Sequence, residues 1–128
     1  MAFNVLVVDD SNTMRSIIIK VLKLTKLNIG QIFEANNGRE ALDCLNENWV
    51  DLVLSDLNMP VMSGIEMVRK MAENNLIKDI PVIVISTDGS KKRIEDLRQQ
   101  GIREYIRKPF TPEKLGESID RILGVNHE

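Results

Sequence analysis

The stretch NVLVVDD, residues 4–10, decides the fold class of this 128-residue chain. Four consecutive aliphatic residues, Val5–Val8, precede a pair of aspartates. A strand that is apolar at nearly every position must be covered on both faces, whereas a half-exposed strand would alternate polar and apolar residues. Two later runs, Asp51–Ser55 and Ile80–Ser86, have the same character. These runs predict a parallel sheet buried between two layers of helices.

Five short β-branched runs alternate with five amphipathic helical patterns. Strands are expected at Asn4–Val8, Gln31–Glu34, Asp51–Ser55, Ile80–Ser86 and Glu104–Arg107. Helices are expected around the stripe Met14, Ile17, Ile18, Val21, Leu22; at Gly38–Glu47; around Ile65, Val68, Met71, Ala72; around Ile94, Leu97, Gly101; and around Leu115, Ile119, Ile122, Leu123. A capping box at Ser63–Glu66 and the pair Thr111-Pro112 agree with these boundaries. This alternation predicts a doubly wound α/β domain with right-handed crossovers.

Composition excludes several classes of protein. The chain is long enough for one domain, residues 1–128, and 43% of its residues are hydrophobic. We therefore expect a folded protein whose core needs no disulfide or metal to stabilise it. Cys44 is the only cysteine, which excludes a disulfide scaffold. A net charge of −2 gives no general attraction to nucleic acid or anionic membrane, and no apolar run is long enough to span a bilayer. Since no signal peptide is evident, we expect a cytoplasmic protein.

Polar residues follow four of the predicted strands, at the sheet edge where such folds bind ligands. They are Asp9 and Asp10 after the first strand, Asp56 and Asn58 after the third, Ser86 and Thr87 at the fourth, and Lys108-Pro109 after the fifth. The first strand lacks a glycine-rich phosphate loop, which argues against nucleotide binding.

Three carboxylates at one edge repel, since a pair about 4 Å apart costs about 4 kcal/mol at an effective dielectric near 20. A divalent cation together with Lys108 would neutralise Asp9, Asp10 and Asp56, and an oxygen-only ligand set favours Mg²⁺. Two interpretations follow. The cleft either binds a cation for stability alone, or Asp56 is a nucleophile toward phosphorus, with Ser86 donating to the phosphoryl oxygens and Lys108 offsetting their charge.

Four motifs resemble those of response regulator receiver domains: VLVVDD at 5–10, SDLNMP at 55–60 with Gly64 following, IPVIVIST at 80–87 and YIRKPF at 105–110. Any one of them is weak, but their spacing matches over nearly the whole chain, and the similarity is greatest to the single-domain chemotaxis type. The resemblance implies a flavodoxin-like three-layer sandwich with strand order 2-1-3-4-5.

The resemblance also implies roles for single residues. Asp56 matches the phosphoacceptor, Asp9 and Asp10 the pair that positions Mg²⁺, and the Asn58 backbone carbonyl a further metal ligand. Ser86 and Lys108 match the residues that contact the phosphoryl group, and Tyr105 together with Ser86 matches the switch pair. In this family the bond that corresponds to Lys108–Pro109 is typically cis. Asn58 and Asp88 line the path of attacking water there, so we expect them to tune the phosphoryl lifetime.

The implied function is a two-component response regulator. A histidine kinase would phosphorylate Asp56 in a Mg²⁺-dependent step, and the surface around the fourth helix, fifth strand and fifth helix would then bind a downstream partner, in chemotaxis or motility control. The chain ends soon after the last helix, so we expect no output domain. We also expect no enzymatic activity beyond self-catalysed phosphoryl acceptance and hydrolysis. The resemblance leaves a dedicated phosphatase open as a further partner.

Three alternatives remain at this stage. A phosphorelay intermediate would use the same site. A phosphatase of the haloacid-dehalogenase type needs an acid two residues after the nucleophile, where this chain has Asn58. A flavin carrier needs the phosphate loop that is missing here.

A few residues depart from the pattern or have ordinary roles. Leu57 stands where the best-known chemotaxis member has a tryptophan, so Trp49 is not expected to report phosphorylation, and Thr87 replaces the common alanine after the switch hydroxyl. Cys44 is expected to be a packing residue and His127 part of the tail. Gly116, inside the last helical pattern, has no explanation in the sequence.

Overall fold

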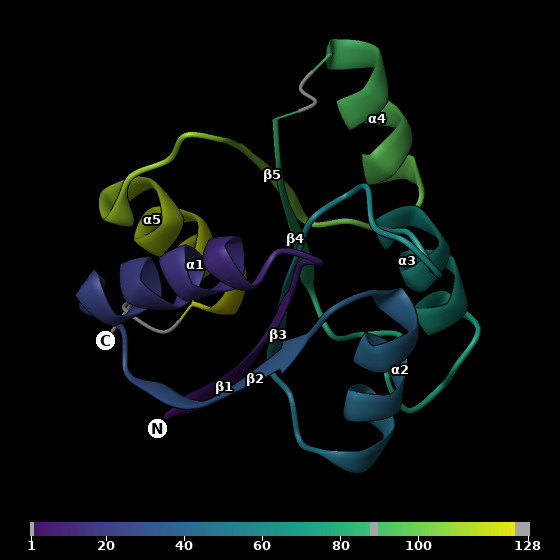
Figure 1. Cartoon of the computed structure of the whole chain (residues 1–128), viewed down its shortest axis with the longest axis horizontal. Helices are drawn as coiled ribbons and strands as arrows, with labels where there is room; N and C mark the ends of the chain where they lie inside the picture. The colour runs from purple at the N-terminus through teal and green to yellow at the C-terminus, as the bar shows by residue number, and fades with distance from the viewer. Residues whose placement is uncertain (1, 88–89, 125–128) are drawn as a thin grey trace.

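The computed structural model describes residues 2–87 and 90–124. It contains a five-stranded parallel sheet and five helices, which alternate along the chain (Figure 1). The strands are β1 (Phe3–Val8), β2 (Ile29–Ala35), β3 (Leu52–Ser55), β4 (Val82–Ser86) and β5 (Glu104–Arg107). The helices are α1 (Asn12–Leu24), α2 (Gly38–Glu47), α3 (Gly64–Ala72), α4 (Lys91–Gln99) and α5 (Pro112–Leu123).

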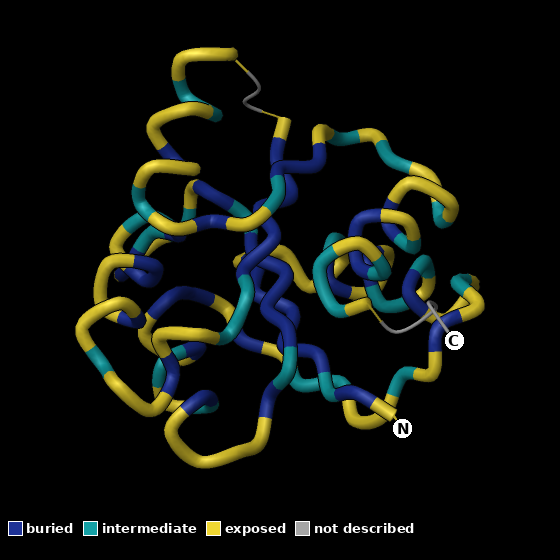
Figure 2. Tube along the Cα trace, turned by 180° about the vertical axis from the view of Figure 1, so that it is seen from behind, coloured by how far each residue is buried: buried dark blue, intermediate teal, exposed yellow. Residues whose placement is uncertain are grey.

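The sheet lies between two helical layers, with α1 and α5 on one face and α2, α3 and α4 on the other (Figure 1). Side chains alternate across a strand, so β1 supplies both halves of the core. Val5 and Val7 pack toward α1 and α5, whereas Leu6 and Val8 pack toward α2 and α3. In Figure 2 the central strands are accordingly buried along most of their length, and the exposed residues lie on the outer helices and loops.

The predicted fold class and the strand order β2-β1-β3-β4-β5 are confirmed. All five strands and all five helices occur where the sequence predicts them, and β5 and α2 have the predicted bounds. Within the described ranges, none of the helices combines the length and the apolarity that crossing a bilayer requires.

The ends of two elements differ from the prediction because local backbone geometry or hydrogen bonding prevents the strand or helix from continuing. The strand expected from Ile80 begins only at Val82, because the Ile80 N–H bonds back to Ile77 in a turn and Pro81 has no N–H to give. Gly101, predicted on the fourth helix, lies beyond its end. Gln100, the C-cap, still has helical dihedral angles, and the φ of +112° at Gly101 then takes the chain out of the helical conformation.

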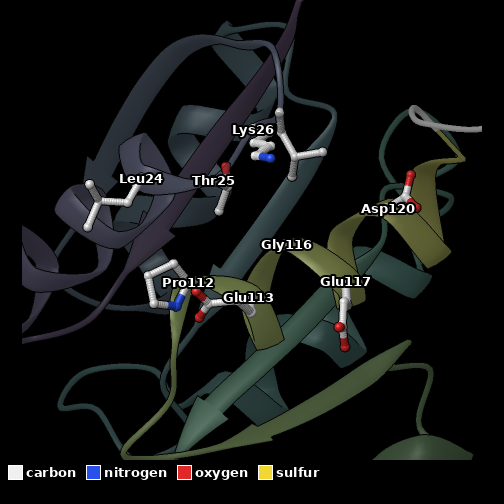
Figure 3. A pocket seen from close by; sticks show the side chains of 9 residues that line it. Leu24, Thr25, Lys26, Pro112, Glu113, Gly116, Glu117 and Asp120 are labelled. Carbon is white, nitrogen blue, oxygen red and sulfur yellow. The ribbon is translucent and has the colours of Figure 1, made fainter.

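The packing of α5 against the end of α1 bears on Gly116. A Cβ at this position would lie 3.6–3.7 Å from Thr25, which is ordinary contact, so the backbone does not require glycine there. Gly116 lies in a groove between α5 and the turn after α1, which Thr25, Lys26, Glu113 and Glu117 also line (Figure 3).

Candidate functional site

The polar residues predicted at the strand ends are held there by an extension of the sheet's hydrogen bonding. The Asp9 N–H donates to Ala35 O at 3.1 Å, and the Asp56 N–H donates to Val8 O at 2.9 Å. On the other side, the Lys108 N–H donates to Ser86 O at 3.0 Å. β1, β3 and β5 are thus each tied to a neighbouring strand one residue past their ends, which fixes where the first loop residues place their side chains.

Three carboxylates meet at this edge. Asp9, Asp10 and Asp56 each present an oxygen, and these oxygens lie within 4.8 Å of one another. Asp9 is buried, Asp56 is half-buried and Asp10 is exposed, so the cluster opens to solvent on one side. Lys108 forms an ion pair with the cluster, with its Nζ 3.5 Å from Asp9 Oδ2. One ammonium group leaves most of the negative charge uncompensated.

The environment of Asp9 fits a hard divalent cation. Its Oδ1 accepts a hydrogen bond from the Ser11 N–H at 2.9 Å. Its Oδ2 is buried and accepts no hydrogen bond from any described residue, although a buried carboxylate oxygen is costly unless it is bonded. An oxygen-only cluster, in which the Lys108 ammonium 3.5 Å away is the described partner of the buried Asp9 Oδ2, matches the preference of Mg²⁺ for one or two carboxylates and several waters.

The Asp56 carboxylate has a fixed orientation and a raised pKa. The Leu57 N–H donates to its Oδ1 at 2.7 Å, which orients the carboxylate. Burial raises the pKa of Asp56, and the neighbouring Asp9 and Asp10 raise it further, against the opposing effects of the Leu57 hydrogen bond and of Lys108. In the absence of a cation, the ionised form of Asp56 therefore lowers the stability of the folded protein.

Gly64 determines the path of the loop that carries Asp56. Its N–H donates to Leu57 O at 2.9 Å, and a Cβ at this position would lie 2.6 Å from Asp56 O. No side chain fits at that distance. The first residue of α3 therefore approaches the backbone of the candidate phosphoacceptor as closely as only glycine allows.

The residues predicted to form the switch lie on the neighbouring strands. Ser86 is buried at the end of β4, and Tyr105 is buried on β5 among the residues that pack toward α4, with 8% of its surface exposed. Thr87 is exposed. The Lys108–Pro109 peptide bond is cis, as the resemblance implies.

Of the two residues predicted to tune the phosphoryl lifetime, one can be placed. Asn58 is exposed two residues after Asp56, and Asp88 lies outside the described residues, as does His127. Cys44 is half-buried on α2, as expected for a packing residue, and burial raises the pKa of its thiol. The roles predicted for Asn58 and Asp88 remain predictions.

Arg15 is a residue of the site that the sequence patterns did not predict. Its guanidinium is buried behind the acidic cluster, where Nη1 donates to Asp9 O at 2.6 Å. A signal was present, because Arg15 lies three residues before Ile18 and seven before Leu22, the two other buried residues of α1. Ile17, expected on the inward stripe, is instead 45% exposed. The inward face of α1 thus begins with an arginine rather than with apolar residues alone.

Comparison with known proteins identifies the family. Residues 5–120 match the response regulator receiver domain family. The chain is 41% identical over 122 residues to chemotaxis protein CheY1 of Helicobacter pylori strain J99, covering 94% of this chain and 97% of the relative. It is 42% identical over 120 residues to a chemotaxis protein CheY homolog of Campylobacter jejuni, covering 93% and 91%.

Solved structures agree with this assignment. Vibrio cholerae CheY4 superposes with a TM-score of 0.84 at 30% identity, covering 95% of this chain and 99% of that one. The CheY of a CheX–CheY–BeF3–Mg complex from Borrelia burgdorferi superposes with a TM-score of 0.84 at 28% identity, covering 94% and 89%. With its acidic cluster at the predicted edge of the sheet and a family match over nearly its whole length, this chain belongs to the response regulator receiver domains.

Proposed function

We propose that this receiver domain accepts a phosphoryl group on Asp56 from a histidine kinase, in a Mg²⁺-dependent step, and thereby controls binding of a partner in chemotaxis. The observation that supports this most directly is the cluster of three carboxylates whose oxygens lie within 4.8 Å of one another. One of these oxygens, Asp9 Oδ2, is buried, accepts no hydrogen bond from the described residues and is paired with Lys108. The chemotaxis assignment rests on the relatives, which are named as chemotaxis proteins.

The residues at the site suit phosphoryl transfer to a carboxylate. Asp9 and Asp10 would hold the metal together with Asp56 and the backbone carbonyl of Asn58. When bound, Mg²⁺ offsets the negative charge shared between the phosphoryl oxygens and the acceptor. The Leu57 N–H orients Asp56, so that a carboxylate oxygen can attack phosphorus. The O–P bond forms as the N–P bond to the donor histidine breaks, and the imidazole leaves.

Lys108 and Ser86 would hold the product. The modified residue carries more negative charge than the free carboxylate. Lys108 lies 3.5 Å from Asp9 and can move to a phosphoryl oxygen. Ser86 is the last residue of β4, and its hydroxyl can donate a hydrogen bond to another phosphoryl oxygen. We expect the protein to catalyse only the phosphorylation of its own Asp56 and the hydrolysis of the resulting acyl phosphate.

The signal would reach the surface through β5. Tyr105 follows Glu104, whose carboxylate bridges the helices on either side of the strand, to Arg98 of α4 at 3.8 Å and to Arg121 of α5 at 2.9 Å. We propose that movement of Ser86 toward the phosphoryl group stabilises the inward position of Tyr105 and changes this α4–β5–α5 surface, where a downstream target binds. The Borrelia relative was solved in a complex with CheX, which illustrates that such proteins act through partners.

A small phosphodonor tests the proposal without the kinase. The protein is incubated with acetyl phosphate and either Mg²⁺ or EDTA, and intact mass is measured. We expect one added phosphoryl group that requires Mg²⁺, is lost on treatment with hydroxylamine and is absent from Asp56→Asn but present in Asp43→Asn, an exposed carboxylate on α2. Steady multiple turnover with phosphate release would instead favour a phosphatase, and no added mass under any condition would refute the proposal.

A further inference from the structure

Arg15 is the one charged residue on the inward face of α1, and it is 7% exposed. A buried guanidinium must be satisfied by several acceptors. It donates from Nε to Glu34 Oε1 at 3.0 Å, from Nη1 to Asp9 O and to Asn36 Oδ1 at 2.7 Å, and from Nη2 to Asn12 Oδ1. These acceptors come from α1, the β1–α1 loop, the end of β2 and the β2–α2 loop, so one side chain joins four segments.

The Asp9 contact has a consequence for the acidic cluster. The Asp9 N–H is bound to Ala35 O and its Oδ1 to the Ser11 N–H, and Arg15 holds its carbonyl. Every polar atom of Asp9 except Oδ2 is thus held by a hydrogen bond. The remaining oxygen is the one beside Lys108, where a cation would bind.

The same contact orients Asp10. The Asp9 carbonyl belongs to the planar peptide unit that links Asp9 to Asp10, so a bond to that oxygen fixes the rotation of the whole unit. Asp10 itself is exposed, and its side chain accepts no hydrogen bond from residues 2–87 or 90–124. Arg15 is therefore the side chain that sets the direction in which the backbone presents Asp10.

The charge of Arg15 is balanced on the side away from the cluster. Glu34 forms an ion pair with it at 3.0 Å, and Asn36 is held in turn by Glu40, which accepts from its backbone and side-chain N–H groups at 3.1 Å. A bare arginine beside the cluster would repel a divalent cation. The pair with Glu34 lets the guanidinium position the ligands at little electrostatic cost to metal binding.

We propose that Arg15 is a positioning residue for the metal ligands: by holding the Asp9 carbonyl, it orients the Asp9 and Asp10 carboxylates for Mg²⁺. This rests on the proposed function of the site. Outer residues that orient metal ligands typically contribute a factor of about 10–100 to metal affinity. Lysine cannot replace arginine here, because it offers no planar fork of donors to four separate acceptors.

The test is Mg²⁺ alone, titrated calorimetrically into the wild type and into Arg15→Lys, Arg15→Met and Asn36→Ala, with circular dichroism to confirm folding. We expect the Kd for Mg²⁺ to rise about tenfold in both Arg15 variants, the lower end of the range for residues that orient ligands. Asn36 is exposed, so its replacement leaves the fold intact and loosens Arg15 at one contact only. A smaller rise in Kd is expected there.

Two controls separate positioning from other effects. Arg69→Met removes an exposed arginine that donates to Gln100, and Ile18→Val destabilises the same face of α1; neither is expected to change the Kd. A lower melting temperature with unchanged Mg²⁺ affinity in the Arg15 and Asn36 variants would show that Arg15 is only structural. Tighter binding in Arg15→Met with no change in Arg15→Lys would show that only its charge matters. Either result overturns the inference, whereas a wild type that binds no Mg²⁺ overturns the proposed function and the inference with it.

Discussion

Replacing Asp56 by asparagine is expected to stabilise the metal-free protein. The substitution removes one of three clustered negative charges and keeps the shape of the side chain, and the amide oxygen can still accept the hydrogen bond from the Leu57 N–H. Because burial and the two neighbouring aspartates raise the pKa of Asp56, its ionised form is disfavoured in the folded state relative to the unfolded chain.

The magnitude follows from the geometry. At the 4.8 Å limit for the carboxylate oxygens, each pair repels by about 3.5 kcal/mol at an effective dielectric of 20 and by about 0.9 kcal/mol in water. Asp10 is exposed, so its contribution is close to the value in water, and Lys108 at 3.5 Å offsets part of the contribution of Asp9. We therefore expect the free energy of unfolding of Asp56→Asn to exceed that of the wild type by about 1–2 kcal/mol near neutral pH.

Urea unfolding followed by circular dichroism measures this difference in EDTA and in excess Mg²⁺. Because the pKa of Asp56 is raised in the folded state, this carboxylate costs the wild type no stability below its unfolded-state pKa of about 4. Its cost grows as pH rises through the folded-state pKa. The advantage of Asp56→Asn should thus vanish in acid and grow toward neutral pH. A cation at ten times its Kd stabilises the wild type by about 1.4 kcal/mol, so Mg²⁺ should narrow the difference.

Asp43→Asn is the matched control, since it removes an exposed carboxylate on α2 and is expected to change stability little. If Asp56→Asn were less stable than the wild type in EDTA at neutral pH, the repulsion on which the metal site is argued would be absent. The same conclusion would follow if its advantage did not depend on pH.

Three further predictions concern the backbone. Gly116→Ala should raise the free energy of unfolding by about 0.5–1 kcal/mol in urea melts, because alanine favours the helix and its Cβ would meet Thr25 at ordinary contact distance; a loss of stability would show that the groove does not accommodate it. Val61→Asn should also stabilise, by roughly 0.5–1 kcal/mol in the same assay, since Val61 is exposed and holds a φ of +67°, which is unfavourable for a β-branched residue; an unchanged midpoint would contradict this. Gly64→Ala should lower both the melting temperature and the rate of phosphorylation by acetyl phosphate, because its Cβ would lie 2.6 Å from Asp56 O, and a normal rate would mean that the loop can shift without displacing the acceptor.

The fold could be predicted because its signals are local. Val5–Val8 is apolar on both faces, which is enough to require two helical layers, and the capping box at Ser63 is formed as the spacing predicts. The ends of elements were harder to predict. Ile80 is β-branched and apolar, as strand residues often are. Its N–H nevertheless donates to Ile77 O in a turn and is not available to the sheet.

The sequence by itself determined which residue types follow the strands, and parallel pairing then brings Asp9, Asp10 and Asp56 to one edge, because all strands of such a sheet end on the same side. Only the tertiary structure decided which residues support that cluster. In the sequence, Arg15 is indistinguishable from an ordinary charged residue on a helix surface. In the structure, its guanidinium joins segments as far apart as α1 and the β2–α2 loop. Likewise, the requirement for glycine at position 64 comes from the approach of α3 to Asp56, a contact that no local pattern encodes. Strand-end chemistry follows from periodicity, whereas a buried polar network depends on distances that exist only after the layers have packed.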